Sequence, residues 1–358
     1  MCIIQLVKRL LIKGKWVFII IKKIFSDNVP LVYSLLHLKN ESNDFLVAAS
    51  EEEKGSAYAY DLNNDFMKQE VWSDIGGTMT MVQIPGTLDF LATQKFYPGF
   101  NASACELVKL TFEKNSWTTK KMINFPYLHR FDLVEGENET LFIGTTITER
   151  KKSTDDWTSP GKIYVGEYNH EMEQLTNLHS LEIDLIKNHG YCAFKEKGYS
   201  LITSEDGVYQ LFYPTKTSDW VLEKVYDSPV SDIAAIDTDQ DNEFNYYLVI
   251  NEFHGEKISI LNQDFKEVTQ IRGTYPFAHS IWGGIFNGKP CFIFGNREGK
   301  QDYYTISVTE DSGVIDAEFG LIDSQVGSTN TIVFQKDSKQ YLVSANREID
   351  QLAVYEEI

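Results

Sequence analysis

The run Tyr247-Leu-Val-Ile-Asn-Glu252 decides the fold, because related runs recur along the chain at intervals of 44 to 59 residues. Each run is rich in residues that favour β-strands and ends in polar residues. Seven copies are present, and they begin at Phe45, Phe90, Leu141, Ser200, Tyr247, Cys291 and Tyr341. A repeat of this length is typical of architectures in which similar units stack on one another.

Three further strands are predicted around each run. An apolar segment follows after a short turn, as at residues 257–261, and another precedes the run, as at residues 232–236. A fourth lies between successive runs, as at residues 222–226. Four strands per repeat, seven times over, predict an all-β chain: a seven-bladed β-propeller with four antiparallel strands per blade. One blade cannot bury both faces, whereas a closed ring can.

The two ends of the chain are predicted to meet in the last blade. The seventh copy ends after its third strand, and Ile20-Ile-Lys-Lys-Ile-Phe-Ser26 resembles the fourth strands of other copies. We therefore expect residues near 18–26 to complete blade seven and remove a free edge. Residues 18–358 then form one propeller, and residues 1–17 a basic extension. That extension is either disordered or the product of a misassigned start, with an interfacial membrane anchor as a further reading.

The composition excludes several classes of protein. Hydrophobic residues make up 42% of the 358 residues, enough for a large core, and 33 basic against 52 acidic residues give a net charge of −19. This charge argues against a nucleic-acid partner, because phosphate binding requires a basic surface. The four cysteines form no Cys-x-x-Cys pair, so neither a disulfide framework nor a cysteine-based zinc site is expected.

No segment indicates export or membrane insertion. The apolar stretch at residues 16–21 is far shorter than the roughly 20 residues that span a bilayer. No signal-peptide cleavage site follows it. We therefore expect a cytoplasmic protein without a membrane partner. Gly-x-Ser-x-Gly, P-loop and dinucleotide-binding motifs are also missing, which argues against the enzyme classes that use them.

Histidines gather at one position of the repeat, the start of the innermost strand. His129, His189 and His279 precede their runs by 12, 11 and 12 residues, and Asp232 precedes its run by 15. This position lines the central tunnel of a propeller, so side chains from neighbouring blades should converge there. Imidazoles with a carboxylate can chelate a divalent ion such as Zn, Mn or Fe. The alternative is a tunnel lining that only satisfies backbone groups.

Further polar residues are expected around the same mouth, where the second strands end. The predicted substrate-binding residues are Tyr33, Lys95, Asn251, Asn296, Arg297, Asn346, Arg347 and, on an insertion at residues 147–163, Trp157. Glu205, Glu252 and His254 are candidates for proton transfer. The arginines suit a carboxylate or polyhydroxy ligand. The alternatives are that the polar pairs bridge adjacent blades and that the insertion is a plain surface loop.

The fifth repeat carries an acidic loop, Asp237-Thr-Asp-Gln-Asp-Asn-Glu-Phe-Asn245. The alternating residues Asp237, Asp239, Asp241 and Asn245 are spaced as in loops that wrap one calcium ion. Asn242 can adopt the left-handed conformation that glycine usually supplies. The loop should lie on the face opposite the histidines, so any calcium would be structural. The alternative is a solvated acidic turn.

This loop and the strand after it resemble the calcium-loop motif of the FG-GAP/VCBS-type propeller family, Asp-x-Asp-x-Asp-Gly-x-x-Asp plus a hydrophobic strand. The chain departs from the motif at Asn242 and Asn245, and one of seven repeats keeps the loop. Among such propellers, the chain also looks distantly like the propeller part of aldos-2-ulose dehydratases. That likeness implies a metal-dependent sugar lyase or isomerase, with no residue-by-residue match to the catalytic groups.

The leading hypothesis is a metal-dependent lyase or isomerase that acts on a small keto-sugar-like substrate at the tunnel mouth. Its metal ligands would be His129, His189, Asp232 and His279. The partner would be a small molecule or a glycan. The alternative hypothesis is a non-catalytic propeller module that binds a protein or a glycan.

Overall fold

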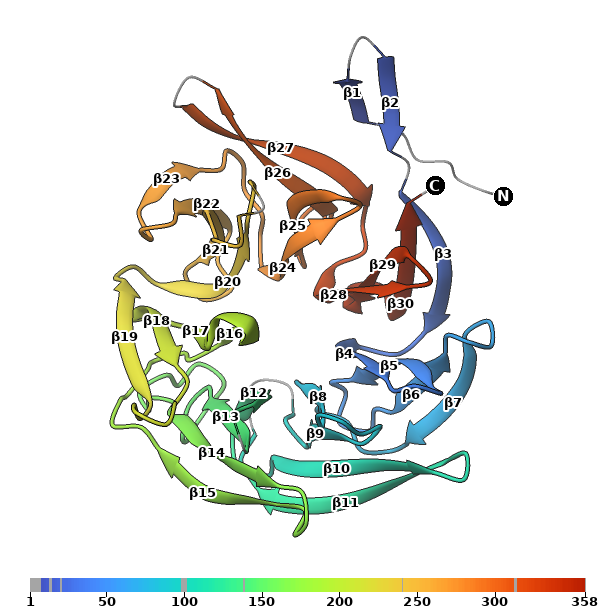
Figure 1. Ribbon diagram of the computed structural model, residues 1–358, viewed down its shortest axis with the longest axis vertical. Coiled ribbons are helices and arrows are strands. Elements are labelled where there is room, and N and C mark those ends of the chain that lie inside the picture. The colour runs from blue at the N-terminus through green and yellow to red at the C-terminus, as the bar shows by residue number, and fades with distance from the viewer. Residues whose placement is uncertain are drawn as a thin grey trace.

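The computed structural model describes residues 8–12, 15–19, 21–97, 102–137, 139–239, 241–311 and 314–357. Within these ranges the chain forms seven four-stranded antiparallel sheets around a central opening, together with one two-stranded sheet (Figure 1). The predicted all-β, seven-bladed propeller is confirmed. Among the described residues, no helix is long and apolar enough to cross a membrane.

Blades one to six each take four strands in chain order, starting from the tunnel. Blade one has β4 (Val32–Lys39), β5 (Asp44–Ser50), β6 (Ala57–Asp61) and β7 (Met67–Trp72); blade two has β8 (Met81–Gln83), β9 (Phe90–Gln94), β10 (Glu106–Glu113) and β11 (Ser116–Asn124). Blade three has β12 (Leu128–Glu135), β13 (Thr140–Thr146), β14 (Ile163–Asn169) and β15 (Gln174–Ser180); blade four has β16 (Gly190–Phe194), β17 (Tyr199–Ser204), β18 (Gly207–Phe212) and β19 (Val221–Tyr226). Blade five has β20 (Val230–Ile236), β21 (Tyr246–Asn251), β22 (Lys257–Asn262) and β23 (Glu267–Gln270); blade six has β24 (Ala278–Phe286), β25 (Lys289–Asn296), β26 (Tyr303–Asp311) and β27 (Val314–Asp323).

Blade seven joins the two ends of the chain. It contains β28 (Ser328–Lys336), β29 (Lys339–Asn346), β30 (Gln351–Glu357) and β3 (Ile21–Asn28), which pairs antiparallel with β30. The predicted N-terminal closing strand is thus confirmed. It spans residues 21–28 rather than 18–26, because residues 15–19 belong to a hairpin that pairs β1 (Lys8–Ile12) with β2 (Lys15–Ile19).

Phe25 anchors the closing strand to blade one. Its ring stacks on Phe66 at 4.3 Å between centroids and meets Tyr60 edge-on at 5.5 Å. The Tyr60 hydroxyl also donates a 2.7 Å hydrogen bond to Asp27. Alternate residues of β3 face away from this contact, so Ile24 is 36% exposed. The closure therefore depends on one face of the strand.

The hydrophobic core lies between neighbouring blades. Every residue of β5 and of β13 is buried, because these second strands are covered on both faces. Trp117 of blade two meets Phe45 of blade one and Phe90 of its own blade edge-on, at centroid distances of 5.9 and 5.7 Å. Each blade thus depends on its neighbours for burial, as expected for stacked sheets in a ring.

An extra residue near the start of the innermost strand recurs in five blades. Strand pairing shifts by one position at Tyr33, His129, Ser231, His279 and Thr329, which is the mark of a β-bulge. A bulge redirects the side chains on either side of it. This irregularity therefore decides which side chains meet at the tunnel mouth.

Truncating Phe25 should loosen the ring closure. We expect Phe25→Ala to lower the free energy of unfolding by about 2 kcal/mol, because a half-buried ring loses its packing partners. Ile24→Ala, on the exposed side of β3, should change it by no more than about 0.5 kcal/mol. Urea unfolding followed by tryptophan fluorescence measures both variants. Equal effects would show that this face does not hold β3 in place.

Candidate functional site at the tunnel mouth

A cavity of about 200 Å³ lies at the tunnel mouth, where the innermost strands begin. Its polar lining residues are His129, His189, His254, His279, Tyr33, Tyr97, Glu51, Arg297 and Arg347. His129 lies in β12, His279 in β24 and His189 directly before β16, with exposed fractions of 1%, 4% and 1%. The structure thus brings together the three histidines of the equivalent repeat position.

The backbone of the next blade fixes the tautomer of each of these histidines. Nδ1 of His129 lies 3.1 Å from the carbonyl oxygen of His189, and Nδ1 of His189 lies 3.0 Å from that of Ser231. Nδ1 of His279 lies 2.7 Å from the carbonyl oxygen of Thr329. A carbonyl can only accept, so each Nδ1 carries the proton and donates. Each Nε2 is therefore left with a lone pair, the state found in metal-ligating histidines.

Burial keeps these imidazoles neutral. Removal from water and, after it, the positive charge of Arg130 lower the pKa of His189 to about 3. The pKa values of His129, His254 and His279 also lie well below the usual value, chiefly through burial. Neutral imidazole is the form that binds metal ions, so Nε2 of His189 and Nε2 of His279 need no deprotonation at neutral pH.

His254 reaches the same cavity from the turn after β21. Its ring stacks between Phe253 and Phe277, at centroid distances of 4.0 and 4.4 Å. Its Nε2 lies 3.2 Å from Nε2 of His189. Ring nitrogens of His189, His254 and His279 all lie within 4.8 Å of one another. The geometry thus places His254, predicted for proton transfer, among the candidate metal ligands.

The two phenylalanines that stack on His254 carry only a weak signal in the sequence. Phe253 directly precedes His254, and Phe277 lies two residues before His279. Nothing in the strand pattern distinguishes them from core phenylalanines. Their adjacency to histidines is the one feature that could have revealed them.

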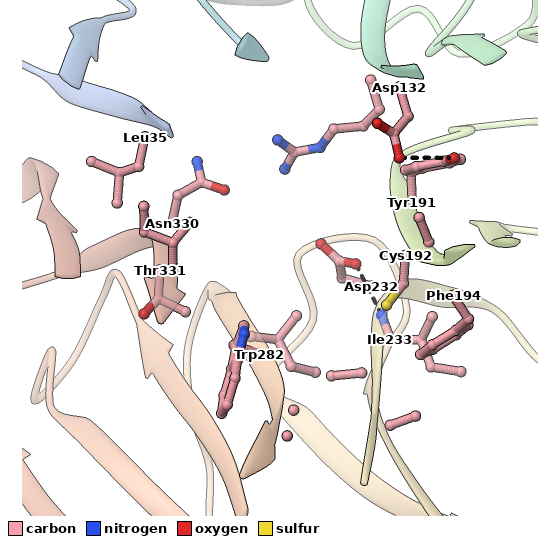
Figure 2. Close-up of a pocket in the computed structure, with 18 of the residues that line it drawn as sticks. Leu35, Asp132, Tyr191, Cys192, Phe194, Asp232, Ile233, Trp282, Asn330 and Thr331 are labelled. Carbon is pink, nitrogen blue, oxygen red and sulfur yellow. Dashed lines mark hydrogen bonds between the residues drawn. The ribbon is translucent and has the colours of Figure 1, made fainter. Parts of the chain in front are cut away.

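Asp232 does not join the histidines. The bulge of blade five falls on Ser231, and Asp232 lines a larger central cavity instead (Figure 2). Burial raises the pKa of its carboxyl group to about 6, although the charge of Arg130 acts in the opposite direction. The residue of blade five that is equivalent to the histidines is Ser231, one before Asp232. The sequence count missed it by one residue, because the acidic loop at residues 237–245 lengthens the connection to the second strand.

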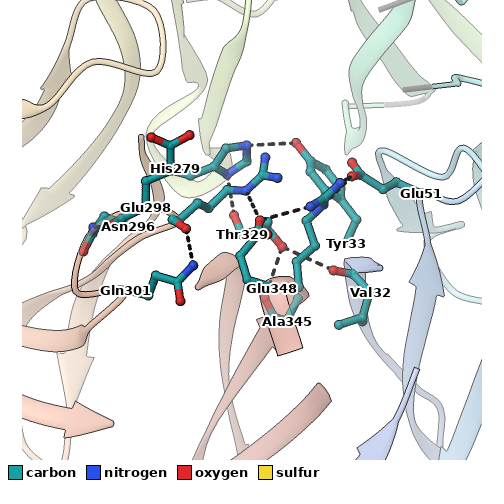
Figure 3. A network of polar contacts seen from close by, with 12 residues as sticks. Val32, Tyr33, Glu51, His279, Asn296, Glu298, Gln301, Thr329, Ala345 and Glu348 are labelled. Atoms are coloured by element: carbon teal, nitrogen blue, oxygen red, sulfur yellow. Dashed lines mark hydrogen bonds and ion pairs between the residues drawn. The ribbon is translucent and has the colours of Figure 1, made fainter. Parts of the chain in front are cut away.

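Two predicted rim residues, Arg297 and Arg347, line the cavity and are held by carboxylates (Figure 3). Arg347 forms ion pairs with Glu51 of blade one and, at 3.0 Å, with Glu348. Glu348 also accepts from Nε of Arg297 in blade six, at 2.7 Å. The arginines therefore bridge three blades while facing the cavity, and the four charges sum to zero.

Tyr33 completes the wall beside His279. Its hydroxyl lies 3.3 Å from Nε2 of His279 and donates to it, since the proton of that imidazole is on Nδ1 (Figure 3). Burial raises the pKa of the phenol, so it stays protonated at neutral pH. Tyr33 thus holds a proton beside a candidate ligand nitrogen.

Six other predicted site residues are not among the lining residues of this cavity. Three asparagines at the ends of second strands make internal hydrogen bonds instead: Asn251 with Ser259, Asn296 with Pro276 and Asn346 with Ser344. Lys95 pairs with Glu106 at 2.6 Å, and Glu205 pairs with Lys187 at 3.0 Å. Glu252 is exposed. The polar groups of the asparagines, Lys95 and Glu205 stabilise strand ends and turns, a role that the sequence pattern does not separate from ligand binding.

Trp157 lies in a second layer around the mouth. Its ring meets Phe253 edge-on at 4.9 Å, and Phe253 in turn meets His189 at 5.3 Å. Nζ of Lys151 lies 3.4 Å from the centroid of the Trp157 ring. The insertion of blade three therefore packs against Phe253, and neither Trp157 nor Phe253 is a lining residue of the cavity.

The acidic loop of blade five is closed by its own hydrogen bonds. Carboxylate oxygens of Asp237, Asp239 and Asp241 lie within 4.8 Å of one another, and Asn242 has a φ of +71°. Asn245 accepts from the backbone N–H of Thr238 at 2.6 Å and donates to Asp239 at 2.9 Å. Its amide thus ties the loop together, and calcium binding stays a prediction.

Comparisons with known proteins support the fold alone. The WD40 beta propeller domain of Doa1 superposes with a TM-score of 0.58 and 9% identity over 94% of this chain and 96% of that one. The Dos1 propeller gives 0.57 and 8% over 97% of this chain and 81% of that one. No protein-family model and no curated protein matches the chain. The resemblances to FG-GAP/VCBS propellers and to aldos-2-ulose dehydratases therefore gain no support.

The histidine tautomers should be visible by NMR. In metal-free protein at pH 7, long-range ¹H–¹⁵N spectra should show His129, His189 and His279 as neutral Nδ1–H forms, still neutral at pH 5 because burial lowers their pKa values. His254 should show the opposite tautomer, because its Nε2 must donate to the bare Nε2 of His189. The ring signal that disappears in a His189→Gln variant is thereby assigned to His189. Charged or Nε2–H rings at these three positions would contradict the hydrogen-bond pattern.

Proposed function

We propose that the protein binds a divalent transition-metal ion at the tunnel mouth through His189, His254 and His279. One observation carries the proposal: these three neutral imidazoles form a cluster with nitrogens within 4.8 Å of one another. The 3.2 Å between Nε2 of His189 and Nε2 of His254 is close to the spacing of about 3.3 Å expected for two nitrogens on one tetrahedral zinc ion. We assign His129 to the cavity wall, because its nitrogens lie outside this cluster.

The ligand chemistry favours zinc. Imidazole suits Zn, Cu, Fe and Ni, whereas Mn prefers oxygen ligands. Since Asp232 lines another cavity, the set has no carboxylate, and we expect Zn²⁺ ahead of Fe or Mn. Three protein ligands leave one tetrahedral position for an oxygen of a small ligand, as in catalytic rather than structural zinc sites.

A metal bound there would act as a Lewis acid on a carbonyl or hydroxyl oxygen of a substrate. The paired charges of Arg297, Arg347, Glu51 and Glu348 sum to zero, so the charge of the ion would attract anionic or oxygen-rich molecules. The cavity of about 200 Å³ admits only a small one. We therefore propose a lyase or isomerase reaction on a small keto-sugar-like substrate, with the two arginines orienting it.

Tyr33 is the group that we propose for proton transfer in this reaction. Its hydroxyl donates to Nε2 of His279, and this bond would be released when that nitrogen binds a metal. The phenol would then be free to donate to a substrate oxygen. Glu205 and Glu252 are not among the lining residues, which weighs against the roles predicted for them.

Metal binding tests the proposal directly. The parent protein, stripped with chelator, should bind one Co²⁺ per chain with the strong visible absorption of tetrahedral coordination. His254→Ala and His279→Ala should each weaken binding by at least about 100-fold, because each removes a ligand. The control His179→Ala changes an exposed histidine of β15 and should leave binding unchanged. Folded parent protein that binds neither Co²⁺ nor Zn²⁺ would overturn the metal site and favour the non-catalytic binding module.

Removing the Tyr33 hydroxyl should strengthen metal binding. Tyr33→Phe removes a hydrogen bond that competes for the lone pair of His279, so we expect Co²⁺ affinity to rise about 2- to 10-fold. Competition with a chelator of known affinity measures the change. Unchanged or weaker binding in a folded Tyr33→Phe variant would show that His279 does not use Nε2 as a ligand atom.

A further inference from the structure

A second cavity, of about 770 Å³, occupies the centre of the propeller and is distinct from the histidine site. It is lined by four of the five residues that follow the bulged positions, Ser34, Arg130, Asp232 and Asn330, and by Asp237, Asn242 and Phe244 of the loop between β20 and β21. It therefore extends towards the face opposite the tunnel mouth. Figure 2 shows Tyr191, Cys192 and Asp232 on one side of this cavity and Asn330 with Thr331 on the other.

Arg130 and Asp232 occupy the same position of the repeat, in the innermost strands of blades three and five. The residues directly after the bulged or equivalent positions are Ser34, Thr80, Arg130, Gly190, Asp232, Ser280 and Asn330. Two of these seven are charged: Arg130 in blade three and Asp232 in blade five. The blade between them has glycine, and a Cβ at position 190 would lie 2.7 Å from Oδ1 of Asp232. Gly190 therefore leaves room for this carboxylate.

Asp232 is a buried carboxylate with little compensation. Its exposed fraction is 9%, and its one hydrogen bond comes from the backbone N–H of Ile233 at 2.9 Å. In the part of the chain that the structure describes, no lysine, arginine or histidine nitrogen lies within the 4.0 Å of an ion pair. A buried carboxylate in this state is costly unless something else pairs with it.

Arg130 carries the opposite charge in the same cavity. Its half-buried guanidinium donates one hydrogen bond, from Nη1 to the carbonyl oxygen of Met79 at 3.2 Å, and lies 6.0 Å from the centroid of the Tyr33 ring. Among the described residues it has no carboxylate partner, Asp232 included. A guanidinium has five N–H donors and Arg130 lines the cavity, so it can donate further hydrogen bonds to a ligand there.

Another charged residue that lines this cavity, Asp132, is paired within the protein. Asp132 accepts from Nζ of Lys195 at 2.7 Å, and the Tyr191 hydroxyl lies 3.4 Å from its other oxygen. Arg130 and Asp232, by contrast, remain apart in the same space. A ligand that carries both opposite charges would satisfy both residues at once.

We propose that the central cavity binds a small zwitterion with an ammonium and a carboxylate group, an α-amino acid or a short peptide. The ammonium group pairs with Asp232 and the carboxylate with Arg130. Phe194, Ile233 and Trp282 supply apolar wall for a side chain. A simple anion or a simple amine would leave one of the two charges uncompensated, and an uncharged polyol would leave both, so the zwitterion fits best.

Isothermal titration with matched probes tests this proposal on metal-free parent protein at pH 7.5. The probes are L-phenylalanine, the dipeptide L-alanyl-L-phenylalanine, 3-phenylpropanoate, which lacks the ammonium group, and 2-phenylethylamine, which lacks the carboxylate. We expect one of the two zwitterions to bind at least about 10-fold more tightly than either singly charged analogue. The preferred zwitterion separates an amino-acid site from a peptide site. Absence of binding by both, or equal binding by the analogues, would overturn the proposal.

Variants locate the bound zwitterion in the cavity. Asp232→Asn should weaken zwitterion binding about 10- to 100-fold without affecting 3-phenylpropanoate, and Arg130→Gln should do the same without affecting 2-phenylethylamine. Asp65→Asn, an exposed hairpin residue, is the charge-matched control. Zwitterion binding that survives both cavity variants would refute the assignment. If a variant does not fold, the titration of the parent protein with the matched probes still decides the proposal. Neither experiment uses a metal ion, so failure of the zwitterion proposal is independent of the histidine site.

Discussion

A hydrogen bond from a tunnel-lining side chain to the backbone carbonyl of the next blade is the interaction on which the rest of this structure depends. It recurs from Thr80 to His129, from His129 to His189, from His189 to Ser231, from His279 to Thr329 and from Thr329 to Val32. Three of these five carbonyls belong to bulged residues, His129, Ser231 and Thr329, where the ladder is interrupted, and a buried carbonyl needs a donor. The neighbouring side chain supplies one and ties adjacent blades together where the ring is narrowest.

The same interaction sets the chemistry of the mouth. A histidine that must donate from Nδ1 cannot also carry a proton on Nε2 while it is neutral, and burial keeps it neutral. One ring nitrogen, Nδ1, therefore donates the structural hydrogen bond, and the other, Nε2, can bind a metal ion. Thr329 satisfies the same backbone requirement without offering a ligand atom. Histidine at His189 and His279, which both belong to the cluster of three, thus exceeds what ring stability requires, and this favours a bound ion over a plain tunnel lining.

The sequence was sufficient for the architecture because strand pattern and turn spacing are local features. Seven runs, their flanking strands and the closing strand from the N-terminal side all follow from such features. Asp232 shows where this reasoning fails: no residue type encodes a bulge, so its position had to be counted across an irregular loop. His254 shows a different limit, since its entry into the cavity depends on a φ of +50° and on stacking between two rings. Asn346 was indistinguishable from a rim residue until its bond to Ser344 was visible.

The two cavities differ in whether their charged side chains form ion pairs with one another. At the mouth, Glu51, Arg347, Glu348 and Arg297 compensate one another across three blades, so their charges contribute to ring cohesion before any ligand arrives. In the centre, Arg130 and Asp232 form no ion pair with each other, and the charge of Arg130 offsets only part of the cost of burying Asp232. A chain with 52 acidic and 33 basic residues has ample carboxylates to pair with one arginine. No carboxylate of the described residues pairs with Arg130, which lines the cavity, and binding explains this better than a shortage of partners does.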